Sequence, residues 1–235
     1  MSIDAAREAL ALLHAAVVGP TVELVLSAHS NGLGQADKRT REYVGQVGVF
    51  ADDAFCDDAF FTEGFIEKKA QDEIRVMEDI LGCAFVMAQT SIKRVANSTR
   101  ALNALAKSST IAQKTVHELM RWPGHERQAP PYSKIELIDA VANWWKHREE
   151  WPCDWAEITT RQARETAQRI ASLGISSNTP GKLLEIVGHF GLSAPSAQMT
   201  SNLAPLWALV RQWAEAVETA VWDEFSVLYS DLRRD

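Results

Sequence analysis

The sequence contains little cysteine, and its cysteines are not spaced as pairs. Cys56, Cys83 and Cys153 are odd in number and far apart, which excludes a zinc ribbon and a disulfide framework. This usage is typical of a protein in a reducing compartment. We therefore expect a cytoplasmic protein.

Long apolar runs are also absent. No stretch approaches the length of about 18 apolar residues that a membrane-spanning helix needs. The first residues include Asp4 and Glu8, whereas a secretory signal peptide begins with positive charge alone. We expect neither a membrane segment nor a signal peptide.

The chain lacks the alternating pattern that marks a β-strand. Apolar residues instead recur every three or four positions, which predicts an all-α helical bundle. The regular spacing of apolar residues between Phe65 and Val95 predicts a long central helix, or a helix pair that continues to Leu119 and stops before Pro123-Gly124. The other expected elements are helices at Ser2–Val18, Pro20–His29, Gln35–Val47, Ser133–Glu150, Ala156–Leu173, Pro180–Phe190 and Pro205–Leu232, and a short helix or ordered loop at Ala51–Phe61.

The length of the chain suits one domain, residues 1–235. A proline-containing connector at 122–132 is the one candidate boundary. It would separate an N-terminal bundle, residues 1–127, from a C-terminal helical part, residues 133–235.

Positive charge is scarce overall but locally concentrated. The chain carries a net charge of −7, yet residues 93–134 hold 8 Lys and Arg against 2 Asp and Glu. Five of these cations recur at intervals of seven, opposite the apolar positions of a continuous helix, where they would form a row about 42 Å long. The row consists of Lys93, Arg100, Lys107, Lys114 and Arg121.

This basic row has three interpretations. Outward helix positions are usually charged, so the row can be a plain solvent-facing surface. It can also bind RNA or another polyanion through residues 93–121, because clustered cations attract phosphate despite an acidic total. The third interpretation is contact with an acidic protein surface, including the acidic N-terminal third of this chain.

Carboxylates are concentrated in residues 52–67, which contain six of them. Hard cations take oxygen ligands, so this segment is the one candidate metal cluster. It lacks the spacing of a calcium-binding loop, and interleaved phenylalanines are typical of an acidic surface strip. We predict no metal site and no cofactor.

The expected helix Ser133–Glu150 carries the residues with the most chemical potential. Ser133 and Glu136 form a capping-box pattern at its start. Asp139, Asn143 and His147 follow at intervals of four and therefore share one face. The side predicted to be buried consists of Ile135, Ile138, Val141, Ala142 and Trp145.

This face can support acid–base chemistry. His147 can exchange a proton near neutral pH, Asn143 can orient it or a phosphate, and Lys146 can stabilise developing negative charge. Arg148 adds a further cation beside the imidazole. The alternative is a polar helix face whose neighbouring tryptophans hold the following loop; those tryptophans are Trp144, Trp145, Trp151 and Trp155.

The run Ala142-Asn143-Trp144-Trp145-Lys146-His147 resembles the motif of the HEPN family, α-helical bundles found in RNases, toxins and antiviral defence proteins. The family motif is an Arg, often followed by a polar residue, and then a His four to six residues later. Asn143 matches the polar residue and His147 the His. The place of the Arg, within 140–142, holds only alanine and valine.

The resemblance implies a homodimer in which both motif helices line one RNA-cleaving cleft. It implies a metal-independent endoribonuclease of a bacterial defence or toxin–antitoxin system, with His147, Asn143 and Lys146 at its centre. The missing Arg leaves an alternative open, a non-catalytic interaction or regulatory subunit of a multi-protein complex that can include nucleic acid.

Overall fold

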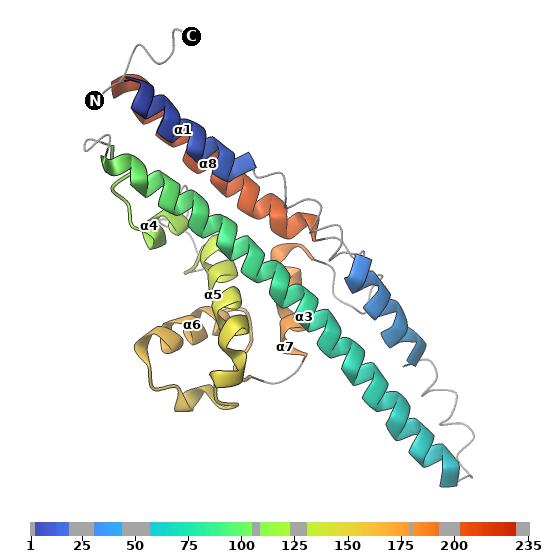
Figure 1. The fold of residues 1–235 in the computed structure, drawn as a ribbon. Coiled ribbons are helices and arrows are strands. Elements are labelled where there is room, and N and C mark those ends of the chain that lie inside the picture. Colours follow the sequence, from blue (N-terminus) through green and yellow to red (C-terminus); the bar gives the residue numbers. More distant parts are fainter. Residues whose placement is uncertain are drawn as a thin grey trace.

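The computed structural model describes residues 3–18, 31–43, 57–104, 109–122, 131–178, 181–192 and 203–228. These residues are mainly helical (Figure 1). Within the described ranges no strand forms, and the β-type pairing there is limited to one isolated bridge between Asp154 and Ser177. The predicted all-α bundle is confirmed.

Helix α3, Asp57–Ala101, is the central element and about 68 Å long at 1.5 Å per residue. Its apolar steps are buried as the sequence predicts, and fully buried examples are Met77, Leu81, Phe85, Ala88 and Ile92. Helices α1, Ile3–Val18, and α8, Ala204–Leu228, lie side by side along α3 and run antiparallel to each other (Figure 1). Residues 31–43 form a further helix, and Arg39 joins it to α3 through two hydrogen bonds to Glu73 of 2.7 and 2.9 Å.

The other side of α3 holds α4, Val116–Arg121, and α5, Lys134–His147, and α6, Arg161–Ala171, packs on α5 (Figure 1). The predicted capping box at Ser133 and Glu136 is present. Thr115 and Glu118 form a second one at the start of α4. Each box satisfies two backbone N–H groups that would otherwise lack partners in a helix's first turn.

Helix α7, Lys182–Ile186, is preceded at its N-cap position by Gly181, which has no side chain to cap it. Glu78 of α3 replaces the missing cap, because its buried carboxylate accepts the Leu183 N–H at 3.0 Å. One cluster of buried apolar residues extends from Leu10 in α1 to Phe225 in α8. The core therefore includes residues on both sides of 122–132.

Several predicted boundaries differ from the structure. Helix α3 begins at Asp57 rather than at Phe65, so its start includes part of the segment Ala51–Phe61, and residues 51–56 lie outside the described ranges. The predicted helix Pro20–His29 also lies outside them. The described helical residues 31–43 begin before the predicted start at Gln35.

Of the two predicted alternatives for residues 65–119, one continuous helix is wrong, and the structure has separate helices, α3 and α4. Helix α3 ends at Ala101, a 3-10 turn covers Leu102–Ala104, and α4 begins only at Val116. Glu224 of α8 explains the break. Its carboxylate accepts the Ser109 hydroxyl at 2.5 Å, the Thr110 hydroxyl and the Ile111 N–H at 3.3 Å, which gives these groups partners outside a helix.

The straight row of five cations is therefore wrong as a geometry. Lys93 and Arg100 lie on α3, Lys114 lies in the turn before α4, and Arg121 ends α4. Lys107 lies outside the described residues.

Candidate functional site

The polar face of α5 is directed at α3. Asp139 and Asn143 are one turn apart and meet Gln89, which is 2% exposed. Asp139 is itself only 9% exposed. Buried polar groups of this kind need hydrogen-bond partners within the protein, because water cannot supply them.

Gln89 supplies those partners. Its Nε2 donates to Asp139 Oδ1 at 2.6 Å and to Asn143 Oδ1 at 2.8 Å, while its Oε1 accepts from Lys146 Nζ at 2.6 Å. Asn143 Nδ2 also donates to Asp139 Oδ2 at 3.2 Å. Two acceptors on one side and an ammonium on the other determine which way the amide of Gln89 points.

A second cation completes the cluster. Lys93 Nζ lies 3.6 Å from Asp139 Oδ1, and its side chain is 44% exposed. We name the group Gln89, Lys93, Asp139, Asn143 and Lys146 the α3–α5 polar site. It holds two ammonium groups against one carboxylate, so a positive excess remains at the surface of the helix pair.

The pKa of Lys146 is lowered first by burial and then by this excess of positive charge. Partial burial lowers it below the usual value for lysine, and the positive charge of Lys93 lowers it further, while the charge of Asp139 opposes both. An anion bound beside the two ammonium groups would relieve their repulsion.

His147 lies at the edge of this site and does not join its hydrogen bonds. It is the last residue of α5, its side chain is 53% exposed, and its Nδ1 lies 3.2 Å from Oε1 of Glu150. Asp139, Asn143 and His147 were predicted to share one face of the helix. Asp139 and Asn143 are joined by a hydrogen bond, whereas His147 pairs with Glu150. The imidazole is therefore accessible from solvent beside Lys146.

The predicted buried side of the helix is correct except at Trp145. Trp144 is the indole that is 2% exposed, whereas Trp145 is only partly buried and packs on Gly82 of α3. A Cβ at Gly82 would lie 1.9 Å from the Trp145 ring, so only glycine allows this approach. Arg148 stacks on the ring at 3.8 Å and donates to Asp79 at 3.0 Å.

The four tryptophans do pack around the loop after α5. Trp144 makes edge contacts with Trp145 and Trp155, and Trp155 with Trp151, at centroid distances of 5.7 to 6.3 Å. Asn178 links them to the backbone, since it accepts from Trp144 Nε1 at 3.1 Å and donates to the Trp151 carbonyl at 3.2 Å. The end of α5 is therefore held in place.

The structure separates the other predicted nucleic-acid residues from this site. Arg100 is exposed at the end of α3, and Arg121 Nε donates to the buried Glu136 at 2.8 Å. Lys114 donates its backbone N–H to Ile111 in the turn before α4. Among the described members of the row, Lys93 and Arg121 both contact α5, but only Lys93 lies in the α3–α5 polar site.

Gln89 is the site residue that sequence reasoning missed. Gln89 follows Phe85 by four positions and precedes Ile92 by three. This spacing places its polar side chain on the apolar face of α3. A polar residue on a buried helix face signals a partner on the facing helix. That signal was present, but it did not identify α5.

No group of three or more His, Cys, Asp or Glu side chains in the described ranges is placed to hold a metal ion. In the acidic segment 52–67, side chains are described only from residue 64 onward. Among the described helices, none combines the length and apolar character that a membrane crossing requires.

Comparison of the chain with protein-family models, with curated proteins and with solved structures found no match. Any functional conclusion therefore depends on the chemistry of the residues described above. They bring together two ammonium groups, an amide and an accessible imidazole, which is a set suited to binding phosphate and exchanging a proton.

Proposed function

We propose that this protein acts on RNA as a metal-independent endoribonuclease of a bacterial defence or toxin–antitoxin type, resembling HEPN proteins. The observation that supports this most is the α3–α5 polar site, where Lys93 lies near the one carboxylate, Asp139, and Lys146 donates to Gln89, with the exposed His147 next along α5. The two ammonium groups would bind the phosphate of the strand, and the imidazole would exchange the proton.

The proposed reaction needs only groups of this chain and the RNA. Neutral His147 takes the proton of a ribose 2′-hydroxyl, and the 2′-oxygen bonds to the adjacent phosphorus. The bond from phosphorus to the 5′-oxygen breaks, and that oxygen leaves with a proton from water. Lys93 and Lys146 stabilise the negative charge on the phosphoryl oxygens, and the products are a 2′,3′-cyclic phosphate and a 5′-hydroxyl.

We also propose that the protein is a cytoplasmic homodimer. His147 lies at the exposed end of α5, so two copies can bring both imidazoles to one strand. Light scattering during size-exclusion chromatography tests this, because a monomer at all protein concentrations would contradict it.

The enzyme proposal is tested by incubating purified protein with total RNA in EDTA. We expect cleavage by the wild type and by Lys38→Gln, a control whose side chain is 78% exposed and pairs with Glu42. We expect none with His147→Ala. Absence of cleavage by the wild type, or equal cleavage by His147→Ala, would exclude the proposal.

The second candidate is a non-catalytic subunit that binds nucleic acid or protein. Two observations favour it. Ala140, Val141 and Ala142, which occupy the place of the family's arginine, are all fully buried, and Asn143 and Lys146 already have partners in Gln89 and Asp139. This candidate predicts RNA binding that weakens steeply with salt, without cleavage and without any effect of His147→Ala.

A further inference from the structure

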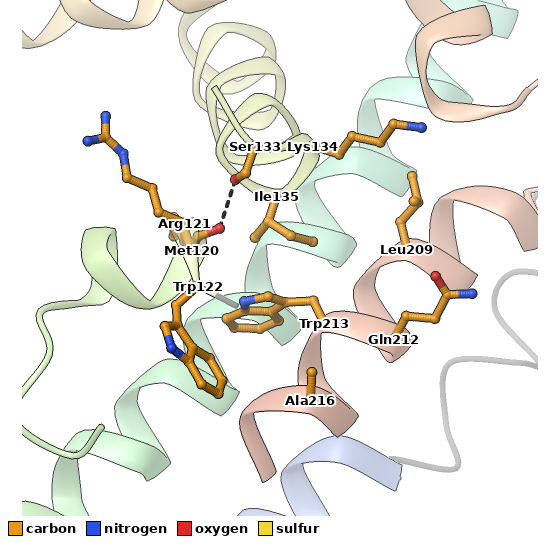
Figure 2. Close-up of a pocket in the computed structure, with 10 residues that line it drawn as sticks. All are labelled: Met120, Arg121, Trp122, Ser133, Lys134, Ile135, Leu209, Gln212, Trp213 and Ala216. Carbon is orange, nitrogen blue, oxygen red and sulfur yellow. Dashed lines mark hydrogen bonds between the residues drawn. The ribbon is translucent and has the colours of Figure 1, made fainter. Parts of the chain in front are cut away.

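A concave site lies near the start of α5, where α4, α5 and α8 meet (Figure 2). Its volume is about 370 Å³, within the range of small-molecule sites. The indoles of Trp122 and Trp213 form its walls together with the apolar side chains of Ile135 and Leu209. We name it the α4–α8 pocket.

The walls of this pocket are fixed by the end of α4. The Leu119 carbonyl accepts two hydrogen bonds, from Trp213 Nε1 at 2.9 Å and from the Trp122 backbone N–H at 3.1 Å. The next carbonyl, of Met120, accepts the Ser133 hydroxyl at 2.7 Å. A pocket held in this way loses little freedom when a ligand binds, which favours affinity.

The charge of the lining has one sign. Lys134 and Arg121 line the pocket, and none of its described lining residues carries a carboxylate. Arg121 points away from the indoles in Figure 2 and is paired with Glu136. Lys134 is exposed, its side chain extends toward the side of the pocket that Leu209 and Gln212 line, and it has no ion-pair partner among the described residues.

We propose that the α4–α8 pocket binds a free adenine mononucleotide. The flat purine ring stacks on indole faces, which accept any planar base. The Gln212 carboxamide can donate to N7 and accept from the N6 amino group of adenine, the pairing by which glutamine reads that base. Lys134 then binds the phosphate as a charge-assisted partner.

This site goes beyond the proposed function, because it shares no residue with the α3–α5 polar site. The test is calorimetric titration of the intact protein with AMP, adenosine and CMP. We expect saturable binding of AMP with a Kd below about 1 mM, and weaker binding of CMP. The His147→Ala variant should bind AMP unchanged, so the two proposals fail or succeed separately.

Two variants test recognition of the phosphate and of the base separately. Lys134→Gln should weaken AMP binding about tenfold and leave adenosine binding unchanged, because only the phosphate partner is lost. Gln212→Ala should remove the preference for AMP over CMP. Lys38→Gln is the matched lysine control on a distant helix and should change neither.

A third variant, Ala216→Leu, fills the pocket without removing a charge or a polar group. We expect it to abolish AMP binding while its thermal unfolding midpoint stays within a few degrees of the wild type. Undetectable AMP binding by the wild type would overturn the proposal, and so would equal loss of adenosine and AMP in Lys134→Gln. Tighter binding of an adenylate pentamer than of AMP, lost in Ala216→Leu, would overturn the assignment to a free nucleotide.

Discussion

Two buried carboxylates, less than one turn apart, join α5 to two different neighbouring helices, and their surroundings differ. Near the start of α5, Glu136 is 1% exposed and accepts from Arg121 at 2.8 Å and from the Ser133 N–H at 2.9 Å. Three residues further along, Asp139 accepts from Gln89 and Asn143 and also lies near Lys93.

The difference concerns charge balance and access. The Glu136 cluster contains one paired guanidinium and a histidine, His117, whose imidazole lies 3.5 Å from the same carboxylate. Burial is the main cause that lowers the pKa of His117, and Arg169 and Arg121 add to it against the attraction of Glu136. That cluster is therefore close to neutral, whereas the α3–α5 polar site keeps an excess ammonium. The first is suited to a structural role and the second to binding an anion.

The largest predicted effect on the free energy of unfolding comes from a substitution that disrupts the Glu136 cluster. Glu136→Ala removes the acceptor for Arg121 and for the Ser133 N–H, and it leaves a partly buried cation without a partner. We expect a loss of about 3 kcal/mol in the free energy of unfolding, measured with urea. Glu118→Ala, in the exposed capping box of α4, is the control and should lower the free energy of unfolding much less. Equal losses would show that Glu136 acts only as a cap.

A smaller effect is expected where α3 meets Trp145. Gly82→Ala places a methyl group inside the indole ring position, so ring and backbone must shift, at a cost of about 2 kcal/mol in unfolding free energy. Gly64→Ala is the matched control on the same helix, because a Cβ there meets nothing within 4 Å. It should stabilise the protein by about 0.5 kcal/mol or more. A destabilised Gly64→Ala or an unchanged Gly82→Ala would refute this packing.

Gln89→Leu tests whether the α3–α5 polar site depends on its central amide. Asp139, Asn143 and Lys146 each lose a hydrogen bond, for which we expect a loss of about 1–2 kcal/mol in unfolding free energy. RNA cleavage should fall as well, because Lys146 loses its position. Thr90→Val, which alters the exposed neighbour of Gln89, should leave cleavage unchanged.

The smallest predicted effect is a pH dependence at His117. Its folded pKa lies below the unfolded value of 6.5, so the unfolded state binds more protons in the window just below pH 6.5. The free energy of unfolding should therefore decrease as pH falls through this window. In His117→Gln this decrease should be smaller, as measured by urea unfolding at pH 7 and pH 5.5. An identical pH dependence in the two proteins would contradict the assignment.

Local signals allowed α5 to be predicted well. The capping box and the apolar steps lie within the helix itself, so the start at Ser133 and the buried positions followed from neighbouring residues. The break after Ala101 did not, because it depends on Glu224, which lies 115 residues after Ser109. Periodicity cannot reveal a partner so distant in the sequence.

The candidate site was predictable in part for the same reason. Asp139 and Asn143 share a face because of their spacing, and the structure joins them by a hydrogen bond. The contact of Lys93 with Asp139 required the packing of α3 against α5. His147 was expected to continue the stack, but the helix ends there and the ring pairs with Glu150.

The central claim is that the C-terminal end of α5, and not its N-terminal end, carries the chemistry. The most direct measurement compares single-turnover RNA cleavage in EDTA by His147→Ala and His117→Ala. These two histidines have similar side-chain exposure, 53% and 44%, and each lies near a glutamate. The account predicts that His147→Ala lowers the rate about a hundredfold or more, as loss of a general base does, while His117→Ala stays within about twofold. Equal rates in the two variants would contradict it.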